Sequence, residues 1–359
     1  MLRIEIQDSQ SYYQGFKEAH VNDCEKLLTM GQYKQIFGVD VSKKTVDTAY
    51  VNGDQMSHRQ FSNDTDGMGA LMQWLADLQL NFSEILFCME ATGLYCFSLT
   101  QFLTSNCIAM WIEHAAHIKK ASSLARGKND KVDSMRIAQY ASKNLDRLRL
   151  WKPVSSTMGK IKHLASLRER LVETKKRLAA PIKELEGVGN LSMAKLLAKT
   201  IKSSLSAIDK DLKNVEAKII DIVNGDENLK QLYELVTSVV GIGFVTAINL
   251  IIHTNGFTVL KDTRKLACYC GVAPFEYSSG SSIRGKTKVH HMANKKLKCN
   301  LHMASLTAVK LDADLKKYYE RKVAEGKNKM SVLNAVKNKL LARIIAVVNK
   351  QQEYVRKVA

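Results

Sequence analysis

The sequence KQIFGVDVSKKTVDTAYVNG, residues 34–53, decides the fold of the N-terminal part of the chain. Two runs of β-branched and apolar residues lie on either side of the polar residues 42–44, a pattern that predicts a β-hairpin. The sequence HRQFS, residues 58–62, predicts a third short strand. Asp40 lies inside the first apolar run, where a charge costs several kcal/mol unless another group pairs with it.

Strands and helices alternate along the rest of the N-terminal part. Apolar residues at helical spacing predict helices at 67–80, 93–106 and 129–144, and short apolar runs predict buried strands at 84–90 and 108–113. A hairpin followed by alternating strands and helices is typical of an α/β sheet with helices packed against it.

The sequence LWKPVSS around Pro153 predicts a domain boundary, and the chain beyond it is rich in helix formers. Apolar residues recur there at steps of three and four, at Ile161, Leu164, Leu167 and Leu171. This spacing predicts an antiparallel helical or coiled-coil pair that serves as an arm or an oligomerisation surface. Pro181 and the sequence GVGN at 187–190 are expected to interrupt its helices.

The predicted fold class is therefore α/β plus α, in four parts. An extension covers residues 1–33, and an α/β domain covers residues 34–152. The helical arm covers residues 153–232, and a mainly helical C-terminal domain covers residues 233–359.

The C-terminal part begins with TSVVGIGFVTAINLI, residues 237–251. Gly241 and Gly243 form a turn between an apolar lead-in and an apolar helix, as in a helix–hairpin–helix phosphate grip. A tight buried turn between helices is an equally good interpretation. Both are preferred to a membrane span for the uncharged run 235–252, because that run contains glycines and several polar residues.

The charge of the chain indicates a polyanionic partner. The net charge is +19, from 54 basic and 35 acidic residues, and the segment from Ser281 to the end has 19 Lys and Arg against 5 Asp and Glu. Such an excess is most often associated with nucleic acid, although a solvated basic face is the alternative. The residues expected to contact phosphates are Arg284, Lys286, Lys288, Lys295 and Lys296.

Four acids are candidates for a metal site. Asp40 and Glu90 lie in predicted buried strands, and Asp130 and Asp133 are three residues apart on a predicted helix, so they project from one face. If they converge, their mutual repulsion is relieved by Mg²⁺, a hard cation that prefers oxygen ligands. The alternatives are structural acids at strand ends, as expected for Asp47, and a solvated face of the helix.

The order and spacing of four stretches resemble a known family. They are FGVDVSKKTVDTAYV, MEATGLY, GKNDKVDSMRIAQYA and SVVGIGFVTAINLI…CGVAPFEYSSGSSIRGK. From about residue 34 onwards the chain resembles the DEDD-type transposases of the insertion-sequence-one-ten family, the bridge-RNA-guided recombinases, and their relatives the Piv-type DNA invertases. The resemblance implies a ribonuclease-H-like (RuvC-type) catalytic domain, a coiled-coil arm and a C-terminal transposase domain. It also implies that Asp40, Glu90, Asp130 and Asp133 are catalytic.

The stretch APFEYSSGSSIRGKTKVHH, residues 273–291, reads either as a solvated linker or as a serine loop. A linker has no need of the adjacent cationic run, whereas a serine nucleophile requires activation, which the acids and their metal ion would supply. We therefore expect a loop serine to attack the scissile phosphate. In the family the serine that immediately precedes glycine matches Ser279, and Ser278 is the alternative.

Three functions remain open at this point. The preferred one is a transposase or site-specific DNA recombinase acting on donor and target DNA, with a bridge RNA implied by the resemblance. The others are a metal-dependent nuclease or Holliday-junction-resolvase-like enzyme that uses water, and a non-catalytic nucleic-acid-binding protein. We expect a homo-oligomer, either a dimer or a tetramer, without membrane association. Seven scattered cysteines favour a reduced, intracellular protein, and we expect it in the bacterial cytoplasm in association with the nucleoid.

Overall fold

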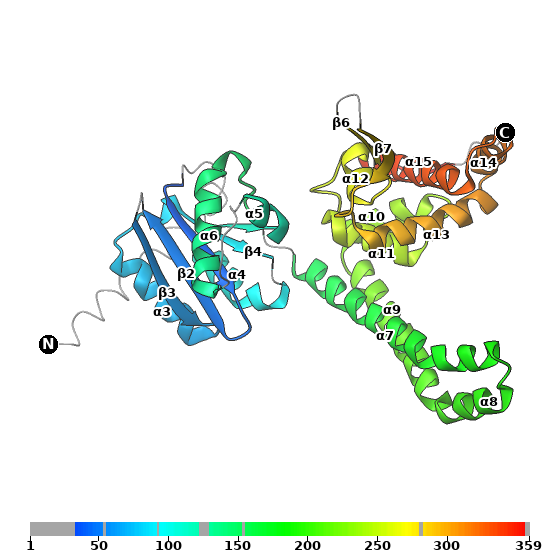
Figure 1. Ribbon diagram of the computed structural model, residues 1–359, viewed down its shortest axis with the longest axis horizontal. Coiled ribbons are helices and arrows are strands. Elements are labelled where there is room, and N and C mark those ends of the chain that lie inside the picture. The colour runs from blue at the N-terminus through cyan, green and yellow to red at the C-terminus, as the bar shows by residue number, and fades with distance from the viewer. Residues whose placement is uncertain are drawn as a thin grey trace. The chain divides into compact units, whose positions relative to one another are not determined.

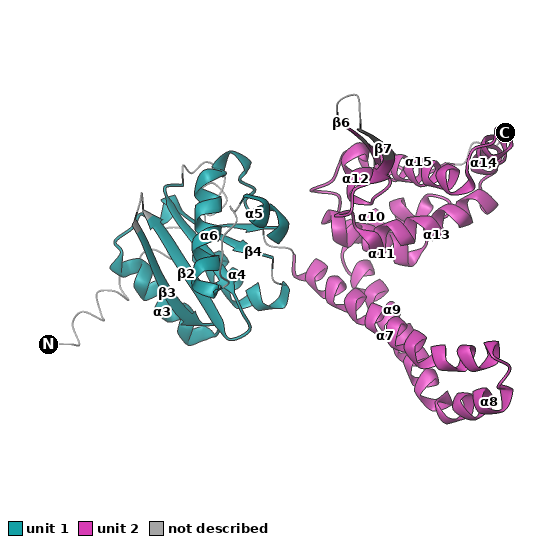
Figure 2. Cartoon of the chain, viewed as in Figure 1, with its two compact units in different colours: residues 1–153 teal, residues 154–359 magenta. Residues whose placement is uncertain are grey.

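The computed structural model (Figure 1) describes residues 33–52, 55–91, 93–121, 129–152, 155–279 and 283–355. The chain divides into two compact units, residues 1–153 and residues 154–359, which are coloured separately in Figure 2. The extension predicted for residues 1–33 lies outside the described residues, apart from its last position.

The first unit is built on a mixed five-stranded sheet with the strand order β3-β2-β1-β4-β5. The strands are β1 (Gln35–Val41), β2 (Thr45–Asn52), β3 (Gln55–Ser62), β4 (Ile85–Glu90) and β5 (Ala109–Glu113). β1, β2 and β3 pair antiparallel, whereas β4 runs parallel to β1 and β5 runs parallel to β4. The predicted hairpin and the predicted later strands are confirmed.

Helices cover both faces of this sheet. α3 (Thr65–Asp77) and α4 (Phe97–Ser105) pack on the face of Phe37, whose ring stacks on Tyr50 and Phe87 at centroid distances of 4.7 and 4.8 Å. α5 (Ala115–Ala121) and α6 (Asp130–Lys143) cover the opposite face, and Figure 1 shows α6 crossing the strands. Short 3₁₀ turns complete the unit, namely η1 (Phe82–Glu84), η2 (Gly93–Cys96) and η3 (Leu145–Arg147).

α6 approaches β1 more closely than a side chain between them would allow. A Cβ atom on Gly38 would lie 2.1 Å from the backbone nitrogen of Ala138 and 2.3 Å from the carbonyl oxygen of Ser134. The α6 residues at the contact are small and fully buried, since Ser134, Ala138 and Ala141 have no exposed surface. Backbone therefore packs directly on backbone, two residues before Asp40 in β1.

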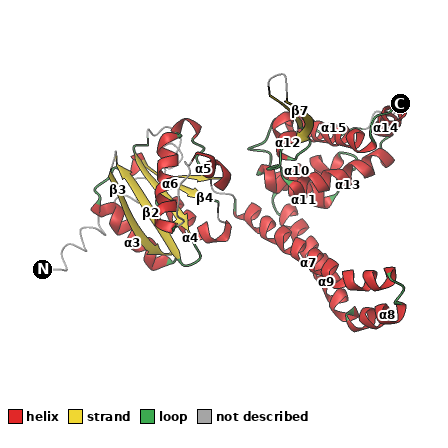
Figure 3. Ribbon diagram, in the orientation of Figure 1, coloured by secondary structure: helices red, strands yellow, loops and turns green. Residues whose placement is uncertain are grey.

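Within its described residues, the second unit is helical apart from one hairpin (Figure 3). The helices are α7 (Ser156–Gly187), α8 (Leu191–Thr200), α9 (Lys202–Asn224), α10 (Glu227–Ser238), α11 (Phe244–Thr254), α12 (Thr263–Tyr269), α13 (Lys295–Leu311), α14 (Ala313–Ala324) and α15 (Lys329–Lys350). α7 and α9 lie side by side and form the predicted helical pair (Figure 1). The base of this arm shares one core with the C-terminal helices, because Ile161 and Ile219 are buried in the same cluster as Leu250 and Leu340.

The prediction that Pro181 interrupts the arm is wrong, because α7 continues through it to Gly187. A proline inside a helix removes one backbone hydrogen bond and costs about 3 kcal/mol. α7 also packs against α8 and α9, and these contacts hold the helix together around the exposed Pro181. The chain breaks instead in the predicted GVGN sequence, where Gly189 has a φ of +81°. Leu167, expected in the buried stripe, is 43% exposed.

Most of the stretch predicted as a serine loop is a β-hairpin. β6 (Pro274–Ser279) pairs antiparallel with β7 (Ile283–Val289), with an irregularity in register between Phe275 and Tyr277. Aromatic residues at every second position of β6 and basic residues at every second position of β7 have the period of a strand. The serines and glycines between them concealed this pattern, and residues 280–282 lie outside the described residues.

Across the described ranges, no helix has both the length and the apolar character needed to cross a membrane. The uncharged run 235–252 is divided between α10 and α11 by the turn at 239–243. Gly241 in this turn has a φ of +95°, a conformation that favours glycine.

Substitution of Gly38 by Ala should destabilise the first unit by about 1–3 kcal/mol, because the added methyl group has no space beside the α6 backbone. All three tryptophans of the chain lie in this unit, so tryptophan fluorescence during urea unfolding reports on it. Gly69→Ala is the matched control, because Gly69 is an exposed residue of α3 with no atom within 4 Å of its added Cβ. It should stabilise by about 0.5–1 kcal/mol. Equal stability of the two variants would contradict this account of the contact.

Candidate active site

The predicted catalytic acids lie on neighbouring elements of the first unit. Asp40 is near the end of β1, and Glu90 is the last residue of β4. These strands are parallel neighbours in the sheet, and their register places the two acids at the same level. Asp130 and Asp133 occupy the first turn of α6, the helix that packs on β1 at Gly38.

The carboxylates influence one another electrostatically. Burial raises the pKa of Asp40 from its usual value to about 6, and neighbouring negative charges act in the same direction. In decreasing order of effect, these charges belong to Asp130, Asp133, Glu90 and Asp47. The structure therefore brings all four predicted acids into one electrostatic cluster centred on Asp40.

Three of these carboxylates have no partner in the described part of the chain. Asp40, Glu90 and Asp130 form no side-chain hydrogen bond or ion pair with a described residue, whereas Asp133 pairs with Arg136 at 2.9 Å. Within the same residues, no three His, Cys, Asp or Glu side chains are gathered at the spacing of a metal site. The donor set is nevertheless suited to a hard divalent cation, because every donor is a carboxylate oxygen.

Asp47 differs from these acids because its carboxylate has side-chain hydrogen-bond partners. It is opposite Asp40 in the β1–β2 register and is buried. Its carboxylate lies 2.9 Å from His58 Nε2 and accepts hydrogen bonds from Gln60 Nε2 at 3.0 and 3.2 Å. This arrangement agrees with the structural role predicted for Asp47.

Glu113 was not found by sequence reasoning, although it extends the same row of acids. It ends β5 and is paired in register with Glu90. Its carboxylate lies 2.9 Å from His117 Nδ1 and accepts a hydrogen bond from the Tyr140 hydroxyl of α6 at 3.3 Å. Burial raises the pKa of Glu113, but hydrogen bonds from the His114 N–H and His117 lower it overall. The sequence signal that could have identified Glu113 is an acid at the end of the predicted strand 108–113.

The predicted serine nucleophile lies at the end of β6 in the second unit. The register of the hairpin pairs Ser278 with Arg284 and Ser279 with Ile283. The side chains of Ser279, Arg284 and Lys286 lie outside the described residues, so their predicted roles stay predictions. Lys288 is exposed on β7 opposite Phe275.

The two lysines at the start of α13 differ in their surroundings. Lys295 is exposed and free to approach a phosphate. Lys296 is only partly exposed, and its Nζ lies 2.7 Å from a carboxylate oxygen of Glu169 in α7. Of the three predicted phosphate-binding lysines whose side chains are described, Lys288 and Lys295 are therefore exposed, whereas Lys296 is paired.

The Gly241–Gly243 turn combines features of the two predicted alternatives, a tight buried turn and a phosphate grip. A Cβ atom on Gly241 would lie 2.6 Å from the carbonyl oxygen of Ala304 in α13, so this glycine is required by packing. Gly243 is exposed, has no neighbour within 4 Å of an added Cβ, and caps α11 without a side-chain hydrogen bond. The start of α11 is therefore open, as a phosphate grip requires.

Family models match both units of the chain. Residues 37–185 match a model described as a transposase of the DEDD IS110 type, and residues 233–320 match the model described as "Transposase IS116/IS110/IS902 family". Together the matches cover more than half of the chain. The chain belongs to the IS110 family of transposases. It is therefore an enzyme of DNA recombination. The first match contains all four acids, and the second contains the serine hairpin.

Individual relatives agree with this family. The chain is similar to the pilin gene-inverting proteins of Moraxella bovis and Moraxella lacunata, each 26% identical over 328 residues that cover 90% of this chain and 99% of the relative. It is also similar to the transposase for insertion sequence element IS1111A of Coxiella burnetii. That relative is 25% identical, and the match covers 63% of this chain and 68% of the relative.

The raised pKa of Asp40 predicts that Asp40→Asn stabilises the metal-free transposase in a pH-dependent manner. Below about pH 3 Asp40 is protonated in both the folded and the unfolded protein, so the difference in Tm between the variant and the parent should not change with pH there. As the pH rises towards 6, the unfolded parent releases this proton more readily than the folded parent, so the parent loses stability that the variant keeps.

Above about pH 7 the variant should be more stable by on the order of 1 kcal/mol, after allowance for solvent screening, which is a few degrees in Tm. Thermal melts in a chelating buffer across this pH range measure the difference. Asp146→Asn, which changes an exposed acid of the same unit, is the control and should show no such trend. A lower Tm for Asp40→Asn at pH 7 would contradict the electrostatic account.

Proposed function

We propose that this transposase cleaves and rejoins DNA at a divalent-metal site formed by Asp40, Glu90, Asp130 and Asp133. The observation that carries the proposal is the excess of uncompensated negative charge around Asp40, since three of the carboxylates have no described partner. Mg²⁺ would supply positive charge to the oxygens of the reacting phosphate. The acids would hold the ion, and the first turn of α6 would fix two of them relative to β1.

A serine would supply the nucleophile in the proposed reaction. The Ser279 Oγ forms a bond to phosphorus while the bond from phosphorus to one bridging oxygen of the DNA backbone breaks. The serine gives up its proton, the departing oxygen takes up a proton, and the chain is left covalently linked to DNA. Reversal of the same step with a different DNA end rejoins the strand, so no further energy source is required.

The ribonuclease-H-like character of the first unit and the guidance of target choice by a bridge RNA are part of this proposal. The mixed five-stranded sheet is compatible with such a domain. The strongly basic segment after Ser281 is suited to a second polyanion besides DNA. The acids lie in one unit and the serine hairpin in the other, so we propose a homo-oligomer in which one protomer supplies the acids and another supplies the serine.

Two other functions use part of the same residues. A nuclease or junction resolvase that uses water needs the acids but not the serine, and a binding protein needs neither. The related pilin gene-inverting proteins are named for inverting DNA, which requires rejoining as well as cleavage. This supports recombination over either alternative.

Asp130→Asn and Asp133→Asn should each lower the rate of DNA strand cleavage by about 100-fold or more, because charge on the reacting phosphate would lose its stabilisation. Binding of labelled donor and target DNA should be largely kept. Gel assays of cleavage and binding, with and without Mg²⁺ and an RNA transcribed from the DNA that flanks the gene as the candidate bridge RNA, measure both. Asp146→Asn should behave as the parent protein. Full cleavage by the double variant at 130 and 133 would exclude the proposed metal site.

Ser279→Ala should abolish the covalent protein–DNA adduct that the parent protein forms with labelled donor or target DNA. A denaturing gel separates this adduct from free DNA. Loss of the adduct in Ser278→Ala but not in Ser279→Ala would move the nucleophile by one residue. A mixture of Asp130→Asn and Ser279→Ala proteins should recover some activity if protomers share the site. Cleavage without an adduct in any variant would instead favour the water-using nuclease.

A further inference from the structure

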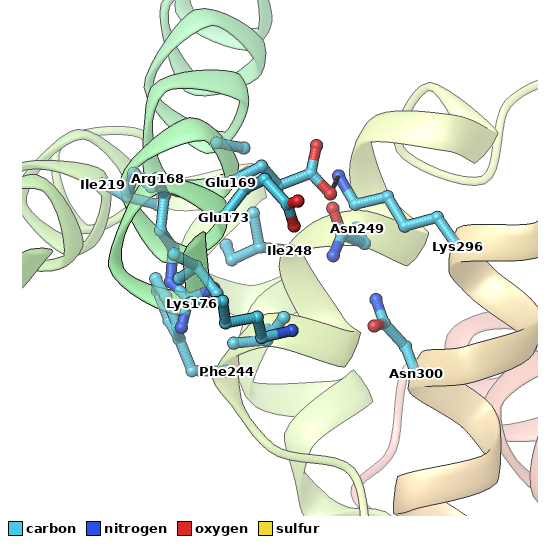
Figure 4. A pocket seen from close by; sticks show the side chains of 13 residues that line it. Arg168, Glu169, Glu173, Lys176, Ile219, Phe244, Ile248, Asn249, Lys296 and Asn300 are labelled. Atoms are coloured by element: carbon cyan, nitrogen blue, oxygen red, sulfur yellow. Dashed lines mark ion pairs between the residues drawn. The ribbon is translucent and has the colours of Figure 1, made fainter. Parts of the chain in front are cut away.

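A cavity of about 430 Å³ with a mixed polar and apolar lining lies in the second unit, where the arm meets the C-terminal helices. We call it the arm-base pocket (Figure 4). Its lining includes Glu169 and Lys176 of α7, Phe244, Ile248 and Asn249 of α11, and Asn300 of α13. The volume is within the range of small-molecule sites, and the functions assigned above make no use of it.

Asn249 is a buried residue whose side chain has no hydrogen-bond partner in the described part of the chain. It is 4% exposed in a mainly apolar helix, and it lines the cavity. A polar group that is withdrawn from water without a hydrogen bond destabilises the fold, so such groups are rare in native proteins. Its presence in the lining of a cavity indicates that a ligand completes its hydrogen bonds.

Asn300 adds a second amide to the lining. Its Nδ2 atom is buried and has no hydrogen-bond partner. Figure 4 shows the amide ends of Asn249 and Asn300 beside the same space, close to the Lys296–Glu169 ion pair. Two amides provide donors and acceptors together, which matches the mixed polar edge of a nucleobase better than a purely anionic or purely apolar ligand.

The other walls suit the remaining parts of a nucleotide. Phe244 and Ile248 offer apolar surface to a flat ring. Most charges of the lining are already compensated, since Glu169 pairs with Lys296 and Glu173 lies 3.2 Å from Arg177. Lys176 has no acidic partner among the described residues. The first turn of α11 also lines the cavity, and its cap provides no side-chain hydrogen bond, so its N–H groups are open to a phosphate.

We propose that the arm-base pocket holds one unstacked base of a single-stranded nucleic-acid segment, with Asn249 and Asn300 bonded to the base edge. The phosphate of the same nucleotide lies beside Lys176 and the start of α11. DNA and RNA share this chemistry, and both are treated as possible sources in the test. The inference rests on the proposed function only in requiring that the protein binds nucleic acid.

Binding of labelled single-stranded 12-mers of DNA and of RNA to the full chain tests the proposal. Asn249→Leu and Asn300→Leu should each weaken binding of the 12-mer that supplies the base by about tenfold, which is the effect of losing about 1.4 kcal/mol. Neither should change the dependence of affinity on salt. Lys176→Gln should reduce the salt slope by about 0.7, the contribution of one phosphate in a single strand. Asn214→Leu, an exposed asparagine of α9, is the matched control and should bind as the parent does.

Two further measurements separate a ligand site from a structural role. Asn249→Leu should raise the Tm of the free protein, because it removes an unpaired buried amide. A photoreactive 5-iodouracil base in the 12-mer should cross-link to the peptide that contains Phe244, and Asn249→Leu should weaken this cross-link. Unchanged affinity of both asparagine variants for both 12-mers, a lower Tm, or a cross-link confined to other peptides would each overturn the proposal.

These experiments involve no strand cleavage. A protein that binds a base in the pocket but never forms a covalent adduct would therefore contradict the proposed recombination chemistry and leave the pocket assignment intact. If the asparagine variants recombined DNA normally and bound single strands as tightly as the parent, the pocket assignment would be contradicted. The proposed recombination chemistry would then stand.

Discussion

The contact between Gly38 and α6 determines how the acids of this transposase are arranged. A helix on a sheet normally stands off by the thickness of two side chains, whereas here backbone meets backbone because Gly38 has no Cβ and Ser134 and Ala138 are small. α6 is thereby fixed over β1 with its first turn close enough for Asp130 and Asp133 to act on Asp40. Any residue larger than glycine at position 38 would displace the helix and its acids together. The close packing at Gly38, two residues before Asp40, therefore determines how near the carboxylates of Asp130 and Asp133 lie to that of Asp40.

The acids along this edge of the sheet differ in whether they have side-chain hydrogen-bond partners. Asp47 on one side is bonded to His58 and Gln60, and Glu113 on the other side is bonded to Tyr140 and lies against His117. Asp40 and Glu90, which lie between them, have no such partner among the described residues. The carboxylates of the flanking acids have hydrogen-bond partners within the protein, so they contribute to the fold without needing an ion. The central acids repel one another and pair with no basic side chain among the described residues, apart from Asp133 with Arg136, and this difference is the reason for proposing a metal site rather than a solvated acidic face.

Sequence periodicity predicted most elements of the fold, because local patterns determine them. The hairpin around residues 42–44, the strand that ends at Glu90 and the helix that carries Asp130 follow from alternation and helical spacing. The β6–β7 hairpin was missed because serine and glycine resemble a loop, and Pro181 was misjudged because tertiary contacts support α7. For the candidate site, the sequence predicted which acids are brought together. It missed Glu113, because only the strand register shows that this residue lies beside Glu90.

The arm-base pocket could not be predicted from local patterns at all. Its walls come from helices separated by more than a hundred residues along the chain, so Asn249 looks like a minor irregularity in an apolar helix until the packing is known. Asp40 and Asn249 nevertheless share one physical property, since both are at least partly buried and neither side chain has a hydrogen-bond partner among the described residues. Each lowers the stability of the unit in which it lies. The aromatic stack around Phe37 in the first unit and the continuous core below the arm in the second offset that loss. Residues that destabilise a fold in this way are expected where a ligand restores the missing interaction. For this physical reason we propose that the acids and the arm-base pocket are functional parts of this enzyme.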